Sequence, residues 1–187
     1  MKENRYDDPL FFEKYSQMSR SRLGLAGAGE WEDLQKLLPD FAGKQVLDLG
    51  CGYGWHCAYA AEHGAAHVTG VDLSEKMLGV ARQKASFPQV EYLHAAIEDV
   101  DFPPESFDVV FSSLAIHYLQ DFPAFAEKVR TCSSPAGTLC SRWSTTYSPP
   151  TATRIGTTTS RATSSTSPWT TTSTRGSARP CSWGRTW

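Results

Sequence analysis

Three alternating glycines and a later aspartate have the types and spacing of a nucleotide-binding loop. Gly50, Gly52 and Gly54 directly follow the apolar run Gln45–Leu49, and Asp72 ends the next apolar run. Glycine tolerates positive φ and lets a ligand lie against the backbone, while a helix that follows offers free N–H groups. A carboxylate about 20 residues after the glycines can accept hydrogen bonds from ribose hydroxyls. The combination predicts a site for a nucleoside-containing cofactor.

A further aspartate separates this loop from the loop of nicotinamide dehydrogenases. Their fingerprint is GxGxxG, and the position of its third glycine holds Trp55. Asp48 lies inside the first apolar run, a costly place for a carboxylate unless it meets a cation or hydrogen-bond donors. A ligand that carries an amino group would suit it. The alternative to cofactor binding is a glycine turn in an α/β protein without a ligand.

The string VLDLGCGYG, with VTGVDLS after it, closely resembles the first two motifs of class I S-adenosylmethionine-dependent methyltransferases, especially the type 11 methyltransferase domain. The resemblance covers roughly residues 15–129. It implies S-adenosyl-L-methionine as the cofactor and methyl transfer to a small-molecule acceptor. It also implies that Asp48, Gly50 and Gly52, in the same loop as Gly54, hold the methionine end and that Asp72 holds the ribose.

The resemblance further implies an adenine site formed by Leu73, Met77, Ala96 and Ile97. The family usually has an acidic residue at the place of Ala96, which accepts from the adenine amino group. Ala96 has no such acceptor, so the backbone N–H of Ile97 is the remaining group that could recognise the adenine. The alternative for Met77 is an ordinary core residue between a helix and the sheet.

The segment from Ser113 to Leu119 follows the end of another predicted strand, at the rim where open parallel sheets place their ligand crevice. Ser113 is therefore assigned to the cofactor site. His117 is the candidate catalytic residue, because its unperturbed pKa of about 6.5 suits a general base. A packed or positioning histidine is the alternative, since many methyl transfers depend mainly on proximity and alignment.

Alternating patterns place these residues on a doubly wound, Rossmann-like, mostly parallel sheet with helices on both faces. Predicted strands cover residues 45–49, 67–71, 90–93 and 107–112, and predicted helices cover residues 9–18, 30–38, 55–63, 74–84 and 121–129. Residues 1–44 are predicted to form an N-terminal helical lid segment, and residues 45–142 the cofactor-binding domain. No histidine pair has a cysteine or carboxylate partner at ligand spacing, so no metal site is expected.

The composition changes abruptly near the end of the last predicted helix. From Thr131 onward there is no Asp, Glu or Lys, and about half of the residues are Ser or Thr. We expect the C-terminal strands of the family's sheet to be missing or non-native and residues 143–187 to be a disordered or frame-shifted tail. The favoured hypothesis is a change of reading frame shortly after Val129, with a genuine Ser/Thr-rich linker as the alternative.

Charge and hydropathy limit the partners. Residues 1–131 hold 12 Lys and Arg against 20 Asp and Glu, a balance that repels nucleic acid. No apolar run is long enough for a membrane helix, so a cytoplasmic protein without membrane contact is expected. Two alternatives to the methyltransferase remain: a noncatalytic cofactor-binding remnant of such an enzyme, and, less favoured, a nicotinamide oxidoreductase.

Overall fold

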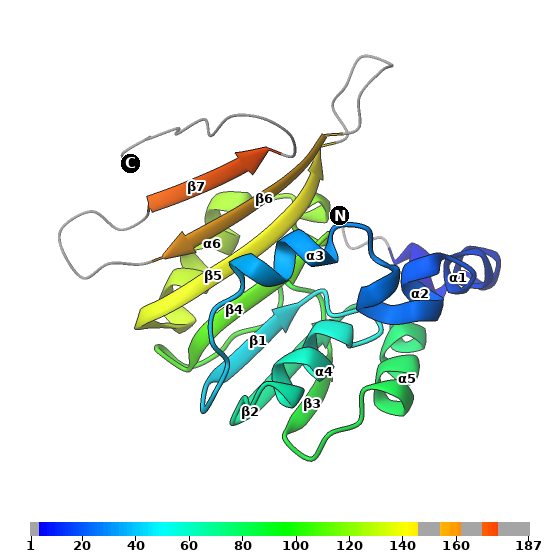
Figure 1. Cartoon of the computed structure of the whole chain (residues 1–187), viewed down its shortest axis with the longest axis horizontal. Helices are drawn as coiled ribbons and strands as arrows, with labels where there is room; N and C mark the ends of the chain where they lie inside the picture. Colours follow the sequence, from blue (N-terminus) through cyan, green and yellow to red (C-terminus); the bar gives the residue numbers. More distant parts are fainter. Residues whose placement is uncertain (1–3, 146–153, 162–169, 176–187) are drawn as a thin grey trace.

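The computed structural model describes residues 4–145, 154–161 and 170–175. They form a seven-stranded sheet in the order β3-β2-β1-β4-β5-β6-β7, with helices on both faces (Figure 1). Strand order reverses between β1 and β4, where crossovers leave in opposite directions, and open parallel sheets place a ligand crevice at such a point.

Helices bury the three central strands of the parallel part of the sheet (residues 45–49, 67–72 and 107–113), which come from apolar, β-branched runs. The parallel part has five strands. These strands are β1 (Gln45–Leu49), β2 (His67–Asp72), β3 (Val90–His94), β4 (Phe107–Ser113) and β5 (Ser133–Thr145). Two antiparallel strands extend the sheet beyond β5: β6 (Arg154–Arg161) and β7 (Thr170–Arg175).

Most of the longer helices begin at residues whose side chains cap them. The α-helices are α1 (Pro9–Ser16), α2 (Ser19–Leu23), α3 (Trp31–Leu34), α4 (Trp55–Glu62), α5 (Glu75–Lys84) and α6 (Phe122–Cys132), and the 3₁₀ turns are η1 (Arg5–Asp7), η2 (Gly24–Gly27), η3 (Gln35–Leu37) and η4 (Ile116–Tyr118). Asp8, Ser74 and Asp121 accept hydrogen bonds from the first turns of α1, α5 and α6.

Apolar cores on both faces fix the sheet between its helices. On one face, α4 and α5 pack on β1 and β2 through Cys57, Ala60 and Leu78. On the other face, α6 packs on β1 and β4 through Phe125 and Val129. Neighbouring residues along β1 and β4 therefore pack into the cores on opposite faces of the sheet, as the doubly wound prediction requires.

Apart from small differences at their ends, the predicted strands of residues 45–112 are confirmed. The predicted helix over residues 30–38 is shorter and divides into α3 and η3. Where the C-terminal strands of the family's sheet are expected to be missing or non-native, β6 and β7 pair onto β5 through their backbones, without the apolar period sought in the sequence. Residues 146–153, 162–169 and 176–187, where the rest of the predicted tail falls, lie outside the described residues.

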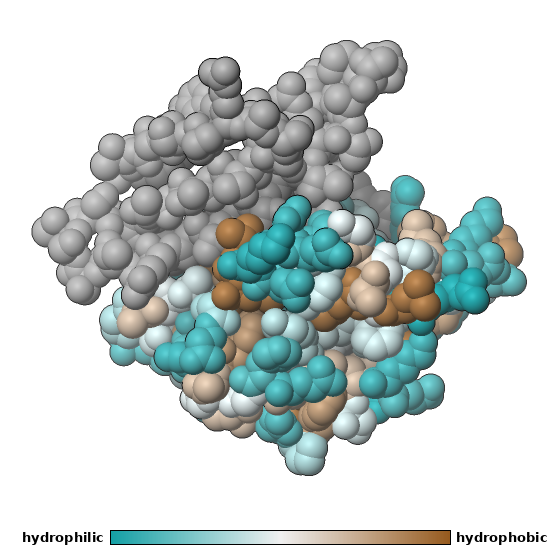
Figure 2. Space-filling model, viewed as in Figure 1, coloured by the Kyte–Doolittle hydropathy of each residue, from teal (hydrophilic) through white to brown (hydrophobic). Residues whose placement is uncertain are grey.

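The N-terminal helices α1 and α2 lie beyond the carboxyl ends of the parallel strands (Figure 1). In the same view, Figure 2 shows hydrophilic residues over much of the helical layer, with apolar patches between the helices. Leu10 and Leu23 of this segment are 70% and 67% exposed. No described helix is long and apolar enough to cross a lipid bilayer.

Candidate cofactor-binding site

The glycine loop joins β1 to α4 at the reversal of strand order. Gly50, Gly52 and Gly54 have φ of 80°, 55° and 74°, so all three adopt the left-handed conformation that favours glycine. The Gly52 N–H donates to Asp72 Oδ2 at 2.8 Å, and the Ser74 N–H donates to Asp72 Oδ1 at 2.9 Å. One carboxylate thus joins the glycine loop to the turn between β2 and α5.

The three glycines meet different surroundings. A Cβ at Gly50 would lie 2.3 Å from the Ala115 Cβ, and one at Gly54 would lie 2.4 Å from the Tyr92 hydroxyl. A Cβ at Gly52 would meet nothing within 4 Å. Gly50 and Gly54 therefore permit close packing, whereas Gly52 leaves an open space beside Asp72.

Asp72 keeps acceptor capacity beside this space. A carboxylate has about four lone-pair sites, and the two backbone N–H groups use one on each oxygen. Burial raises the pKa of Asp72, and hydrogen bonds from the Ser74 and Gly52 amides only partly offset that rise. Hydroxyl donors of a ligand would stabilise the charged form further.

Asp48 carries an unsatisfied oxygen inside the molecule. Only 1% of the residue is exposed; its Oδ2 accepts from the Cys57 thiol at 3.4 Å, and its Oδ1 has no hydrogen-bond partner among the described residues. The side chain borders a small cavity that Tyr59 and Phe111 also line. Burial raises the pKa of Asp48 to about 7. A cationic or N–H donor would satisfy this oxygen, so the residue fits a ligand with an ammonium group.

The predicted adenine residues divide between two sides of the loop. Leu73 follows Asp72 in the turn after β2, and Met77 lies in the first turn of α5. Met77 is 2% exposed. Ile97 reaches the glycine loop, with its Cδ1 3.6 Å from the position of a Gly50 Cβ. Ala96 is buried in the same segment and accepts from the Asp99 N–H.

The rim after β4 holds the remaining predicted residues. Ser113 ends β4 and is partly buried; Leu114 follows with φ of 58°, an unusual value for a residue other than glycine. The His117 ring lies on Tyr118 with ring centres 4.1 Å apart, while much of the residue remains exposed. This partial cover lowers the pKa of His117, so its imidazole is neutral at pH 7 and able to accept a proton.

Sequence reasoning missed Tyr6, which joins the N-terminal segment to the rim. Its hydroxyl lies 3.2 Å from that of Tyr118, and its ring meets Tyr15 edge-on with ring centres 5.4 Å apart. Burial and the Tyr118 hydroxyl raise the pKa of Tyr6. Tyr15 in turn contacts Tyr53 of the glycine loop, with ring centres 5.7 Å apart. Aromatic periodicity indicated that α1 packs somewhere, but not on which loops.

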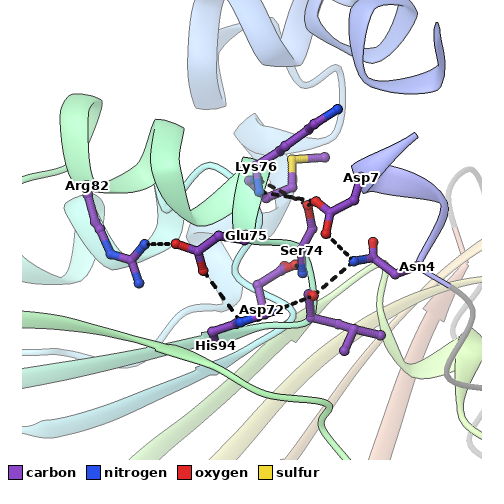
Figure 3. A network of polar contacts seen from close by, with 10 residues as sticks. Asn4, Asp7, Asp72, Ser74, Glu75, Lys76, Arg82 and His94 are labelled. Atoms are coloured by element: carbon purple, nitrogen blue, oxygen red, sulfur yellow. Dashed lines mark hydrogen bonds and ion pairs between the residues drawn. The ribbon is translucent and has the colours of Figure 1, made fainter. Parts of the chain in front are cut away.

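Asn4 and Asp7 were also missed, and Figure 3 shows how they reach the turn after β2. Asn4 Nδ2 donates to the Leu73 carbonyl at 3.0 Å, and Asp7 Oδ1 accepts from Ser74 Oγ at 2.5 Å. His94 also contacts the Leu73 carbonyl, with Nε2 at 2.9 Å. Contacts between residues this far apart in the chain leave no local pattern in the sequence.

The fold and the site define the class of protein. A family model described as a methyltransferase domain matches residues 47–141. The chain therefore belongs to this family, within the class I S-adenosylmethionine-dependent methyltransferases. The cofactor of the family is S-adenosylmethionine, and this membership decides against the nicotinamide alternative.

The chain is similar to a Haemophilus influenzae protein of uncharacterized role, with 41% identity over 140 residues that cover 72% of this chain and 55% of that protein. A Listeria monocytogenes crystal structure classed with the S-adenosylmethionine-dependent methyltransferases superposes with a TM-score of 0.61 and 50% identity, covering 63% of this chain and 55% of that one. Phosphoethanolamine N-methyltransferase of Triticum aestivum is 35% identical over 116 residues, which cover 61% of this chain and 22% of the enzyme. The chain thus spans about half, or less, of the length of these relatives.

Proposed function

We propose that this chain binds S-adenosylmethionine at the carboxyl ends of β1, β2 and β4 and transfers its methyl group to a small-molecule acceptor. The observation that carries the proposal is the Asp72 carboxylate, held by the Gly52 and Ser74 N–H groups next to open space. Two oxygens fixed in place before a ligand arrives lose little further freedom on binding.

Each predicted residue has a distinct task in this proposal. Asp72 accepts from the ribose hydroxyls, and the Gly52 backbone together with the free Asp48 oxygen takes the methionine end. The apolar side chains of Leu73, Met77 and Ile97 flank the adenine base. The Ile97 N–H donates to a ring nitrogen of the base, whereas Ala96 offers no side-chain acceptor for its amino group. Ser113 and Gly54 shape the edge of the crevice.

The bound cofactor supplies a sulfonium centre that gives up its methyl group and leaves as a neutral thioether. The chain's own contribution is to hold the acceptor in line and to exclude water. In this proposal the neutral imidazole of His117, at the rim, accepts a proton from a hydroxyl or amine acceptor. Tyr6 of the N-terminal segment meets Tyr118 at this rim, and Tyr15 packs on Tyr6, which supports the predicted lid.

The acidic balance of residues 1–131 supports a small acceptor rather than nucleic acid. The relative from Triticum aestivum is named as an N-methyltransferase of phosphoethanolamine, an amine, which supports a nitrogen nucleophile of metabolite size. The cytoplasmic location expected from the sequence stays a prediction.

Two measurements test the proposal. Calorimetry with S-adenosylhomocysteine should show binding at one site, and NAD under the same conditions should show none. Incubation with methyl-labelled cofactor and a metabolite pool should then yield a labelled small molecule. Absence of S-adenosylhomocysteine binding by the wild type would overturn the cofactor assignment.

A noncatalytic cofactor-binding protein is the second candidate, because the composition changes abruptly from Thr131 onward, after the strands and loops proposed to bind the cofactor. The nucleotide half would then bind without an acceptor site. The labelling experiment separates the two candidates, since this second protein binds S-adenosylhomocysteine but labels nothing.

A further inference from the structure

We propose that Asp7 is a positioning residue of the cofactor site, which acts through Ser74 on the orientation of Asp72. The inference rests on the proposed cofactor binding. It makes the N-terminal segment a part of the ribose site and not merely a cover over it.

Asp7 reaches the turn between β2 and α5 with both carboxylate oxygens engaged. Its Oδ1 accepts from Ser74 Oγ at 2.5 Å and from the Lys76 N–H at 3.1 Å. Its Oδ2 accepts from Asn4 Nδ2 at 2.6 Å. Burial alone would raise the pKa of Asp7, but these hydrogen bonds outweigh it and lower the pKa, so the group is a carboxylate at neutral pH.

Ser74 transmits this contact because all its polar groups are engaged. Only 1% of the residue is exposed; its hydroxyl donates to Asp7 and accepts from the Met77 N–H at 3.1 Å. Its own N–H donates to Asp72 Oδ1 at 2.9 Å. Without Asp7, the buried hydroxyl loses its acceptor and gains freedom to rotate, and the turn that carries Asp72 loses its outer support.

Asn4 braces the same turn from the neighbouring residue. Its amide nitrogen donates to the Leu73 carbonyl at 3.0 Å while it also contacts Asp7. Leu73 stands between Asp72 and Ser74, so the N-terminal segment holds the turn at two consecutive residues (Figure 3). The contacts run in one continuous chain from Asp7 through Ser74 and Asp72 to Gly52.

The adjacent residue provides a matched control. Asp8 accepts from the Phe11 N–H at 2.8 Å and so caps α1, but no hydrogen bond joins its side chain to the turn after β2 among the described residues. Asp8→Ala therefore removes a carboxylate from the same segment and loosens a helix start without touching the chain of contacts to Asp72.

The test uses a ratio of affinities, which a merely structural role leaves unchanged. S-adenosylhomocysteine and its 2′-deoxy analogue are titrated into the full chain, and the ratio of their Kd values measures how well Asp72 recognises the ribose. A charge-assisted hydrogen bond makes this ratio about tenfold or more in the wild type. All variants are measured well below their Tm.

Three substitutions at Asp7 separate geometry from charge. Asp7→Ala should reduce the ratio at least about threefold. Asp7→Asn keeps an oxygen in place for Ser74 and Lys76 but turns an amide nitrogen toward the donor Asn4 Nδ2, so its ratio should lie between those of Asp7→Ala and the wild type. Asp7→Glu keeps the charge but displaces the carboxylate, so its ratio of Kd values should resemble that of Asp7→Ala. If the alanine variant does not fold, Asp7→Glu takes its place in the test. Asp8→Ala should retain the wild-type ratio.

The outcomes distinguish the inference from the proposed function. A wild-type ratio in both Asp7→Ala and Asp7→Glu, even with a lowered Tm, overturns the positioning role and leaves the cofactor site intact. A wild type that binds neither ligand overturns the proposed function and the inference with it. A wild type that binds both ligands equally overturns the ribose assignment of Asp72 on which the inference depends.

Discussion

The carboxylate of Asp72, at the carboxyl end of β2, has a counterpart near the amino end of β4. Asp108 Oδ2 accepts from the Gln45 N–H at 3.0 Å, where β1 begins. Both aspartates therefore accept a hydrogen bond from a backbone amide near a strand end, but only Asp72 borders the glycine loop. The pair allows the effect of losing a carboxylate to be separated from the effect of losing a ligand contact.

We expect Asp72→Ala to weaken S-adenosylhomocysteine binding by more than about tenfold, because it removes charge-assisted hydrogen bonds of about 1.5–3 kcal/mol each. Asp108→Ala should leave that affinity unchanged. Calorimetric Kd and Tm are measured for both variants and the wild type. Unchanged affinity in Asp72→Ala with a lowered Tm would mean that Asp72 only shapes the turn.

The burial of the Asp48 carboxyl group predicts that the stability of the protein without its cofactor depends on pH. Burial raises its pKa from 3.8 to about 7, so its contribution to stability is fully present below pH 3.8 and is lost as pH rises through about 7. The loss is on the order of 4 kcal/mol at full effect. The difference in unfolding free energy between wild type and Asp48→Asn should therefore fall from pH 4 to pH 7 and then level off.

Denaturant unfolding at several pH values measures that difference. Comparing the two proteins at each pH removes any constant penalty that the asparagine amide brings. A difference that does not change across this range would show that Asp48 is ionised in the folded protein throughout, contrary to its burial.

His117 predicts an acid limb in the pH profile of methyl transfer. Because the pKa of its imidazole is lowered, the rate should fall only as pH drops below about 6.5, where the base becomes protonated. His117→Gln should remove the limb and lower kcat by about a hundredfold or more without changing cofactor affinity. His63→Gln, on α4's far end, is the control; an unaltered profile in His117→Gln assigns the residue to packing.

At the scale of elements, the loop and helix α5 make opposite use of glycine. Gly50 has φ of 80° and faces Ala115, whereas Gly79 lies within α5 with nothing within 4 Å of the position of a Cβ. The first glycine is required by its backbone and its neighbour. The second only loosens a helix.

We expect Gly50→Ala to destabilise the protein by about 1–3 kcal/mol, because its Cβ would overlap Ala115 at a strained φ. Gly79→Ala should stabilise it by about 0.5–1 kcal/mol. Midpoints of denaturant unfolding report both changes. Equal effects of the two substitutions would contradict the close approach of Ala115 to the loop.

The elements that carry the predicted site were accessible from sequence because each depends on local patterns. Apolar runs ending at Gly50 and Asp72 fixed two strand ends, and Ser74 marked the start of a helix. Asn4, Tyr6 and Asp7 were not accessible, since their partners lie far along the chain. Asp7 and Asp8 are neighbours in the sequence, but only Asp8 precedes the proline that begins α1; Asp8 caps that helix, whereas Asp7 contacts the turn after β2.

At the scale of the whole molecule, the proposed site draws only on the parallel strands and the N-terminal segment. β6 and β7 lie beyond β5, away from the β1–β4 reversal. The change of reading frame after Val129 stays a hypothesis, which translation of the gene in its other frames tests. A fifth strand and an antiparallel pair with alternating apolar residues should appear in one of those frames.

A chain that ends after Thr145 should keep S-adenosylhomocysteine affinity within about threefold of the full chain, because distant, independent sites behave additively. It should also be less soluble, because the hydrogen-bonding edge of β5 loses its partner β6. Calorimetry and sedimentation measure the two properties. A loss of affinity as large as that in Asp72→Ala would place part of the site beyond β5.

The contacts of the N-terminal segment also set an order of events during synthesis. Tyr6 leaves the ribosome before its partner Tyr118, which is 112 positions later, and Asp7 leaves before its partner Ser74, which is 67 positions later. The N-terminal segment can therefore form all of these contacts only after β1 to β4 have been translated. A nascent chain therefore completes the proposed ribose turn only when the N-terminal segment folds back onto it.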